Sequence, residues 1–106
     1  MKFDYVIAGG GSAGCALAAR LAENSNISVC LIEAGGKGRE LFIKMPAGNG
    51  FVFGNPKLDW GYSTVPQKSL DNRSIYLARG KALGGSSIVN GMMYMRGVPA
   101  DYDQWR

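Results

Sequence analysis

The beginning of the chain combines two short apolar runs with one helical pattern. Residues 3–8 (Phe-Asp-Tyr-Val-Ile-Ala) are rich in aromatic and β-branched residues, which predicts a buried strand. Residues 12–24 predict a helix, because apolar residues recur at four-residue spacing along one face. These residues are Ala13, Leu17 and Leu21. Residues 27–32 (Ile-Ser-Val-Cys-Leu-Ile) predict a second strand, so that residues from about 3 to 33 form one βαβ unit.

The middle of the chain follows neither pattern. Residues 35–61 contain seven glycines and two prolines and are too long for the short connection of a simple parallel sheet. Residues 61–65 and 74–78 predict two strands, with Asp71-Asn72 at the turn between them. We therefore expect an antiparallel excursion inserted after the βαβ unit.

Several apolar side chains in this stretch need a place to pack. Residues 41–43 and 51–53 form two apolar islands, which we expect to pack inward through short helical turns. Trp60 and Tyr62 stand at the base of the excursion. They either fill a core beneath it or line a cofactor cleft.

A glycine motif lies at the junction of the first strand and the helix. Gly9, Gly11 and Gly14 satisfy G-x-G-x-x-G in the strand–turn–helix context that gives this motif its meaning. In order, they permit a tight turn, a close approach of pyrophosphate to the backbone and close helix–strand packing. The helix start offers unpaired N–H groups to phosphates, and Ser12 adds a hydroxyl.

An acidic residue completes this pattern. Glu33 stands at the end of the second strand, 19 residues after Gly14. A carboxylate at this place accepts hydrogen bonds from an adenosine ribose and repels a 2′-phosphate. The βαβ unit thus predicts a dinucleotide site, and it permits either NAD or FAD.

A second glycine-rich motif spans residues 79–97. Its segment Gly84-Gly85-Ser86-Ser87 can bring backbone N–H groups and two hydroxyls close to a ligand. Arg79 and Lys81 beside it suit an anionic ligand. Taken alone, the motif is equally compatible with a loop that precedes a buried, Met-rich helix.

Composition and charge narrow the chemistry further. The 106-residue chain has 12 basic and 8 acidic residues, a net charge of +4, and it has no basic helix or aromatic–basic motif typical of nucleic-acid binding. It contains no histidine, which excludes a Ser-His-Asp triad and a His-ligated zinc site within these residues. Cys15 and Cys30 are too few for a disulfide scaffold or a four-cysteine metal site. We expect both cysteines to be small packing side chains, Cys30 buried within its strand, and we predict no metal site.

The hydrophobic runs are also short. None approaches the roughly 18–20 residues that a membrane helix needs, and the N-terminus lacks the pattern of a signal peptide. We therefore expect a cytoplasmic protein without a transmembrane segment.

The two glycine motifs, in this order, resemble those of the glucose–methanol–choline (GMC) oxidoreductase family of flavoenzymes. The similarity extends over essentially the whole chain, and its second motif is long. The matching segments are residues 9–14, 33–35, 59–62, 73–76, 79–90, 94, 96–97 and 101–103.

The resemblance implies a fold and a set of site residues. The fold is α/β, the N-terminal part of a Rossmann-like FAD/NAD(P)-binding domain, with the βαβ unit and inserted antiparallel strands but without the substrate domain. Residues 1–106 would form a partial FAD-binding domain, with residues 79–97 as its second FAD-contacting motif. The residues implied to bind FAD are Gly9, Gly11, Ser12, Ala13, Gly14, Glu33, Ala34, Arg79, Gly80, Gly84, Gly85, Ser86, Asn90, Gly91 and Met92.

These residues divide by the part of FAD that they would meet. Residues 9–14 would hold the pyrophosphate, Glu33 the adenosine ribose, and residues 79–86 the phosphates and the ribityl chain. Asn90, Gly91 and Met92 would approach the isoalloxazine ring, where backbone dipoles tune its electronics. The side chains that we expect in the core instead are Met93, Tyr94 and Met95.

The resemblance also implies an activity that these residues cannot complete. Family members oxidise alcohols, with a base that is usually histidine taking the hydroxyl proton while hydride passes to the flavin. No histidine is present, so we expect non-covalent FAD, a chain inactive by itself, and two partners: the remainder of the enzyme and a small alcohol substrate. The alternatives are a non-redox family member such as a lyase, part of an NAD-dependent dehydrogenase, and a non-enzymatic interaction module.

Overall fold

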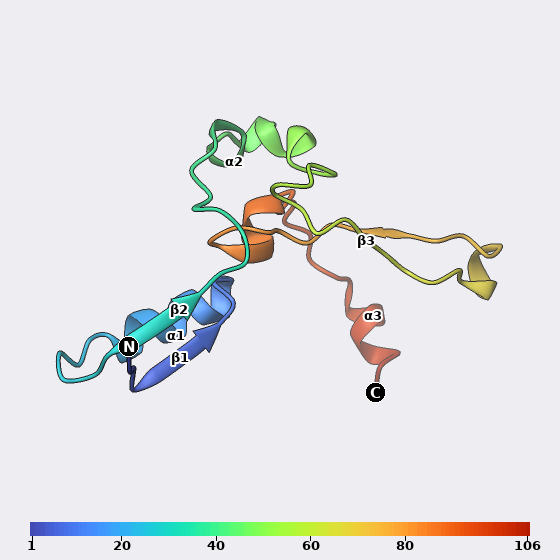
Figure 1. Ribbon diagram of the computed structural model, residues 1–106. Helices are drawn as coiled ribbons and strands as arrows, with labels where there is room; N and C mark the ends of the chain where they lie inside the picture. The colour runs from blue at the N-terminus through green and yellow to red at the C-terminus, as the bar shows by residue number, and fades with distance from the viewer.

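The computed structural model describes residues 1–48 and 50–106 and has a mixed α/β architecture (Figure 1). Its first three elements are strand β1 (Tyr5–Ala8), helix α1 (Ser12–Leu21) and strand β2 (Val29–Ile32). The two strands pair in parallel along their whole length. The predicted βαβ unit is therefore confirmed, and the carboxyl ends of both strands meet at one edge.

Helix α1 is short because its sequence favours a helix only between Gly11 and a local turn. Alanine and leucine make up most of its residues, and these are strong helix formers. It ends at Leu21, three residues before the predicted end. Beyond it, the Asn24 side chain accepts a hydrogen bond from the backbone N–H of Asn26 at 3.0 Å, a turn that competes with further helix.

The two faces of the parallel strands differ in how they are covered. Ile7 lies against Gly14 of α1, so alternate residues of β1 point away from the helix. Val6 and Ile32, on that other face, are each more than half exposed. Cys30 shares this face and is half-buried, whereas we expected it to be buried. The reason is that nothing in the described part of the chain covers this face.

The predicted antiparallel excursion is present as a long arm. Strand β3 (Tyr62–Ser63) pairs with β4 (Tyr76–Leu77), and the short helix η2 (Lys68–Leu70) lies near the tip. Asp71 and Asn72 both adopt positive φ, which confirms the predicted turn. The regular strands are shorter than predicted, and the arm projects away from the rest of the molecule (Figure 1).

Between β2 and β3 the apolar islands form a small helical lobe. It consists of α2 (Leu41–Lys44) and η1 (Pro46–Phe51). The rings of Phe42 and Phe51 stack with centroids 4.7 Å apart. The expected short helical turns are thus present, but the islands pack inward only in part: Val52 and Ile43 join the core, whereas Leu41 and Phe51 are each 65% exposed.

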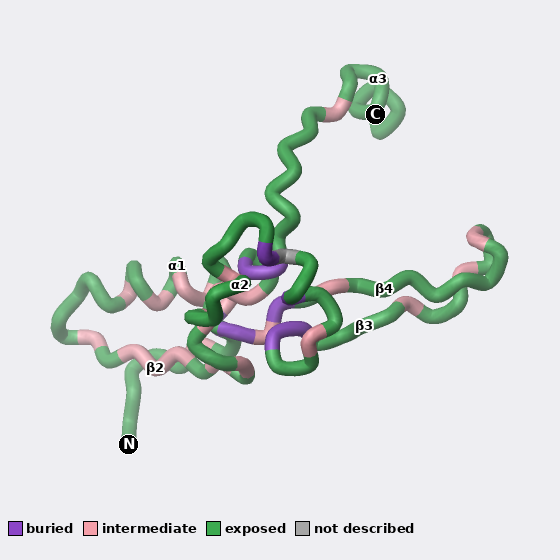
Figure 2. The backbone as a smooth tube through the Cα atoms, turned by 90° about the horizontal axis from the view of Figure 1, so that it is seen from above, coloured by how far each residue is buried: buried purple, intermediate pink, exposed green. Residues whose placement is uncertain are grey.

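A small core joins the middle of the chain to its second glycine motif. The buried apolar residues are Val52, Leu58, Ala82, Ile88 and Val89, with Ile43 and Ala78 packed against them. Of these, Ile88 and Val89 belong to η3 (Gly85–Val89). Figure 2 shows that the buried segments gather at the centre, between the βαβ unit and the arm.

The chain after η3 corrects one prediction. Met93, Tyr94 and Met95 are 84%, 95% and 86% exposed, so placing them in the core was wrong. They lie on an extended segment that leads away from the centre to α3 (Pro99–Asp103), where the described chain offers no apolar surface to cover them (Figure 2).

The lengths of the helices bear on the expectation that the chain has no transmembrane segment. Among the residues that the structure describes, no helix combines the length and the apolar character that crossing a bilayer requires.

Candidate functional site

Two glycine-containing loops meet at the carboxyl edge of the parallel strands. The backbone N–H of Gly84 donates to the carbonyl oxygen of Gly10 at 2.7 Å, and Gly11 and Gly84 form an isolated parallel bridge. A Cβ added to Gly85, which has a φ of +57°, would lie 2.7 Å from the Cα of Gly11. The loops therefore touch backbone to backbone, and at Gly85 only glycine fits this contact. We call it the glycine seam: Gly10, Gly11, Gly84 and Gly85.

The segment that precedes the seam also packs on the exit of β2. The backbone N–H of Leu83 donates to the carbonyl oxygen of Gly36 at 2.8 Å. A Cβ on Gly35 would overlap the carbonyl oxygen of Lys81, and one on Gly80 would overlap that of Gly85. The second motif is thus fixed against the first by main-chain contacts.

A cleft of about 650 Å³ opens beside the seam. It runs along the ends of β1 and β2, past both glycine loops, to the base of the arm. Its lining residues are Ala8, Gly9, Gly11, Ile32, Glu33, Ala34, Trp60, Tyr62, Arg79, Gly80, Gly85 and Ser86. Most residues of the predicted site therefore share one cleft.

Gly9 and Gly14 shape the start of α1 as predicted. Gly9 has a φ of +101° in the turn after β1, and a Cβ on Gly14 would overlap the Gly9 carbonyl oxygen. Gly11 is the N-cap residue, and among the described residues no side chain caps the helix. A Cβ on Gly11 would meet its nearest neighbour, the Cα of Gly85, only at 3.9 Å. The first N–H groups of α1 therefore have no side-chain cap, and Gly11, which precedes them, lines the cleft.

Glu33 holds the first glycine loop in place. Its Oε2 accepts a hydrogen bond from the backbone N–H of Gly10 at 2.7 Å, and its Oε1 accepts one from that of Gly35 at 2.9 Å. The residue is half-buried and lines the cleft. Each carboxylate oxygen has a further lone pair, so the predicted contact with a ribose remains compatible with this role.

Cys15 lies next to this loop without facing the cleft. Its thiol is half-buried and donates to the carbonyl oxygen of Gly10 at 3.1 Å. This agrees with the expected small packing side chain.

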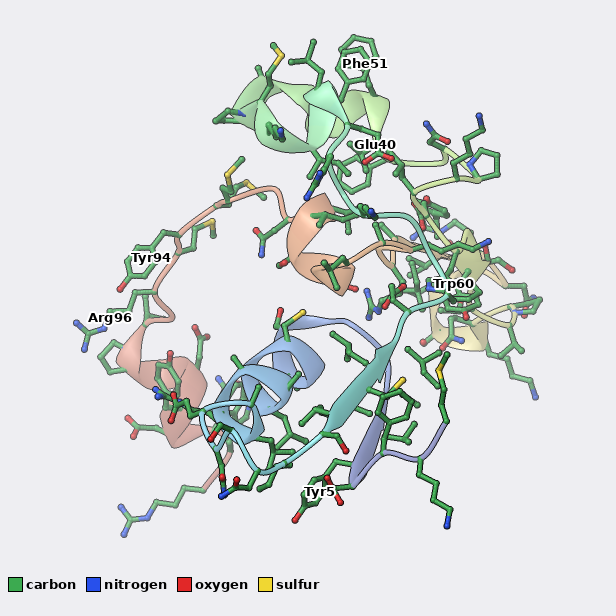
Figure 3. The ribbon with its side chains drawn as sticks, turned by 60° about the vertical axis from the view of Figure 1, so that its left-hand side comes forward. Tyr5, Glu40, Phe51, Trp60, Tyr94 and Arg96 are labelled. Atoms are coloured by element: carbon green, nitrogen blue, oxygen red, sulfur yellow. The ribbon has the colours of Figure 1, made fainter. Side chains whose placement is uncertain are left out.

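Trp60 and Tyr62 line the cleft, which resolves the choice that the sequence left open. Their rings are nearly parallel, 4° apart, with centroids separated by 5.9 Å. They are 43% and 51% exposed, so neither fills a core. The Nζ of Lys81 lies 4.9 Å from the centroid of the Trp60 ring. Figure 3 shows Trp60 beside the chain that leaves β2.

Asp59 organises the base of the arm and was not singled out from the sequence. It is 3% exposed and accepts backbone hydrogen bonds from Gly61, Arg79 and Gly54 at 3.0, 3.1 and 3.1 Å. The Tyr76 hydroxyl donates to the same carboxylate. Its position beside Trp60 in a glycine-rich segment is the sequence signal that could have identified it. Its role could not be predicted, because its hydrogen-bond donors lie far apart in the sequence.

These hydrogen bonds also fix the charge of Asp59. Burial raises the pKa of its carboxyl, but the donors at Gly61, Tyr76, Arg79 and Gly54 outweigh that effect and lower the pKa from 3.8 to about 2. The hydrogen bond to the carboxylate in turn raises the pKa of Tyr76. Asp59 is therefore ionised at neutral pH and holds four donors.

The remaining predicted site residues lie around the cleft or beyond it. Ser12 and Ala13 are exposed in the first turn of α1, and Gly84 is part of the seam. Asn90, Gly91 and Met92 follow η3 on the segment that leads away, and the structure does not bring them to this cleft. There, Asn90 Oδ1 accepts a hydrogen bond from the backbone N–H of Met92 at 2.7 Å.

Comparison with known proteins adds an independent line of evidence. The family model described as GMC oxidoreductase matches residues 3–106. The chain is 47% identical over 103 residues to an oxygen-dependent choline dehydrogenase of Photobacterium profundum, covering 97% of this chain and 18% of that protein. It is 50% identical over 104 residues to the chloroplastic fatty acid photodecarboxylase of Chlamydomonas reinhardtii, covering 98% of this chain and 17% of that protein.

A solved structure is similar as well. The crystal structure of pyridoxine 4-oxidase from Mesorbium loti matches with a TM-score of 0.82 and 44% identity, over 98% of this chain and 20% of that one. The chain thus spans about a fifth of the length of the proteins that it matches.

Proposed function

The chain belongs to the GMC oxidoreductase family, and from this premise we propose that its cleft binds FAD as the FAD-binding segment of a flavin-dependent alcohol oxidoreductase. The observation that carries the proposal is the side-chain-free surface at Gly11, beside the uncapped start of α1 and next to Glu33. This arrangement fits the adenosine diphosphate part of FAD.

The phosphate end of the site is built from backbone. Gly9, Gly11 and the N–H groups of Ser12, Ala13 and Gly14 would receive the pyrophosphate at the positive end of α1. Gly80, Gly84, Gly85 and Ser86 would cover it from the opposite loop, and Arg79 on the cleft wall supplies a positive charge. Gly85 is explained by the contact between the two loops, because a side chain there would collide with Gly11, whereas Gly11 keeps the phosphate surface free of a side chain.

The ribose end is marked by Glu33 and Ala34. The Glu33 carboxylate would accept hydrogen bonds from ribose hydroxyls with the lone pairs that Gly10 and Gly35 leave free. Its negative charge disfavours a 2′-phosphate, which supports FAD over a phosphorylated nicotinamide dinucleotide.

The architecture proposed for the whole unit is Rossmann-like. Residues 1–106 would form part of an FAD-binding domain, with the βαβ unit at about 3–33 and the second FAD-contacting motif at 79–97. The parallel pairing of β1 with β2 around α1 and the arm inserted after β2 support this assignment.

FAD, when bound, would supply the acceptor for a hydride from an alcohol carbon. This chain would bind and orient it, with Asn90, Gly91 and Met92 near the isoalloxazine ring, and without a histidine for covalent attachment. The base that removes the hydroxyl proton, and the pocket for the alcohol, would come from the remainder of the enzyme. The similarity to a fatty acid photodecarboxylase covers the same residues, so these residues alone do not fix which reaction the whole enzyme catalyses.

Flavin content tests the proposed site. Gly11→Val introduces a side chain at the phosphate surface, and we expect the purified full-length protein to lose its flavin absorbance. Gly50→Val is the matched control, because Gly50 lies outside the cleft and a Cβ there meets nothing within 4 Å. Equal flavin content in wild type and Gly11→Val would overturn the phosphate assignment. A colourless wild type that binds a nicotinamide dinucleotide would favour the dehydrogenase alternative.

A further inference from the structure

We propose that Trp60 and Tyr62 form the wall on which the adenine base of the bound dinucleotide stacks. This inference rests on the proposed FAD site and extends it to the base, for which the glycine motifs provide nothing. It makes the two aromatic residues the part of the cleft that distinguishes an adenine dinucleotide from a bare pyrophosphate.

Their position relative to Glu33 is the first argument. Trp60, Tyr62, Glu33 and Ala34 line the same cleft. If Glu33 binds the ribose, the base attached to that ribose must lie a few ångströms beyond the carboxylate. Trp60 is tied to this region through Lys81, whose ammonium lies over the indole and whose own backbone packs against Gly35, just after β2.

The chemistry of the wall is the second argument. Two large aromatic rings lie within 4° of parallel, and about half of each remains exposed inside a cleft. Flat aromatic side chains that remain partly exposed suit a neutral heteroaromatic base, which stacks without needing a specific hydrogen-bond partner. The Lys81 cation interacts with the indole and restrains its orientation.

The wall is also fixed independently of any ligand. The backbone N–H of Trp60 donates to the carbonyl oxygen of Arg79 at 2.9 Å. On either side of Trp60, Asp59 is buried and Gly61 donates to the Asp59 carboxylate at 3.0 Å. A base would therefore meet a preorganised surface and lose little affinity to ordering it.

Calorimetric titration of ADP and of inorganic pyrophosphate into the full-length protein, after release of its flavin, separates the base from the phosphates. Stacking on an aromatic side chain contributes enough that Trp60→Leu should weaken ADP binding roughly ten- to a hundredfold. Pyrophosphate binding should be unchanged, and Trp60→Phe should retain most of the ADP affinity. Trp105→Leu is the matched control, since Trp105 lies outside the cleft and is 81% exposed.

Two outcomes would overturn the assignment while leaving the FAD site intact: unchanged ADP affinity in Trp60→Leu, or equal weakening of ADP and pyrophosphate. A wild type that binds neither FAD nor ADP would reject the proposed function itself.

Fluorescence gives a second measurement that does not require Trp60 to be replaced. In Trp105→Phe, Trp60 is the remaining tryptophan of the 106-residue segment, and ADP should quench its emission where pyrophosphate does not. For this reading, tryptophans elsewhere in the full-length protein are replaced by phenylalanine as well. Bound ADP without quenching would contradict stacking.

Discussion

Asp59 illustrates how one buried charge can organise residues that lie far apart in the sequence. Its carboxylate receives hydrogen bonds from Gly54, after the helical lobe, from Gly61 and Tyr76 of the arm, and from Arg79 of the second glycine motif. Its neighbour Trp60 and its partner Arg79 both line the cleft. Asp59 is therefore a positioning residue, since it does not line the cleft itself but holds the backbone of Arg79, which does.

Asp59→Asn should destabilise the protein by about 2–4 kcal/mol at pH 7, because a neutral amide replaces the buried, charged acceptor of four donors. The folded-state pKa of about 2 lies below the unfolded value of 3.8. The contribution of Asp59 is thus complete above about pH 4 and is lost as the pH falls toward 2. Urea unfolding of wild type and variant at several pH values measures the difference.

The pH dependence of that difference is the decisive part of the experiment. Wild type and Asp59→Asn should converge in stability as the pH approaches 2. Tyr76→Phe, which removes one donor and keeps the charge, should cost less than Asp59→Asn at pH 7. A difference that stays constant with pH would show that Asp59 is not held ionised by its donors.

At the level of single residues, predictability follows the distance between partners in the sequence. The turn at Gly9 and the close packing at Gly14 could be predicted, because both depend on residues within one βαβ unit. The position of Glu33 at the end of β2 could be predicted too. Its hydrogen bonds to Gly10 and Gly35, and those of Asp59, could not, because they depend on how separate segments meet.

Between elements, the glycine seam determines how the two motifs are joined. Gly84 pairs with Gly10, and Gly85 lies against Gly11. Because the contact is formed by main-chain atoms, it brings the start of α1 and the start of η3 closer than any pair of side chains would allow. The cleft depends on this approach, since both loops contribute to its wall.

Gly85→Ala should lower both stability and flavin retention, because its Cβ would lie 2.7 Å from the Cα of Gly11. Gly54→Ala is the matched control: Gly54 also has positive φ, +71°, but a Cβ there meets nothing within 4 Å. Both variants incur the roughly 1–2 kcal/mol cost of a left-handed alanine. Thermal unfolding and flavin content of the two proteins should therefore differ by the steric effect alone, and identical losses would contradict the seam.

The sequence predicted the type of each element more reliably than its length. The βαβ unit and the antiparallel arm follow from apolar periodicity and turn residues. The strands of the arm are shorter than their apolar patterns, since only Tyr62–Ser63 and Tyr76–Leu77 pair regularly. The Met-rich segment after η3 was expected in a core, yet it is extended, because a hydrophobic sequence does not specify which surface will cover it.

The molecule as a whole is open. Its radius of gyration is 17.8 Å, whereas a compact domain of this length has about 13 Å. Large apolar side chains remain exposed on the open face of β1 and β2, on the helical lobe and along residues 92–95. Contiguous apolar surfaces of this kind mark sites where further protein packs.

We therefore expect residues 1–106, prepared alone, to bind a hydrophobic dye and to associate at micromolar concentration. Addition of the remaining segment of the enzyme should suppress both effects and restore flavin binding, because the exposed apolar faces would then be covered. Dye fluorescence and analytical ultracentrifugation test this. A monomer with well-dispersed NMR signals and no dye binding would contradict it.

The glycine seam has a consequence for how such a site can change over time. Where two backbones touch, a small shift cannot accommodate a side chain, so every substitution at Gly85 meets the Cα of Gly11. The side chains that line the cleft differ from the seam. At Glu33, Trp60 and Arg79, one side chain can be replaced by another of similar size or charge, so ligand affinity can change gradually. Substitutions that change ligand affinity during evolution should consequently occur at these side chains of the cleft, whereas Gly85 in the glycine seam should stay unchanged.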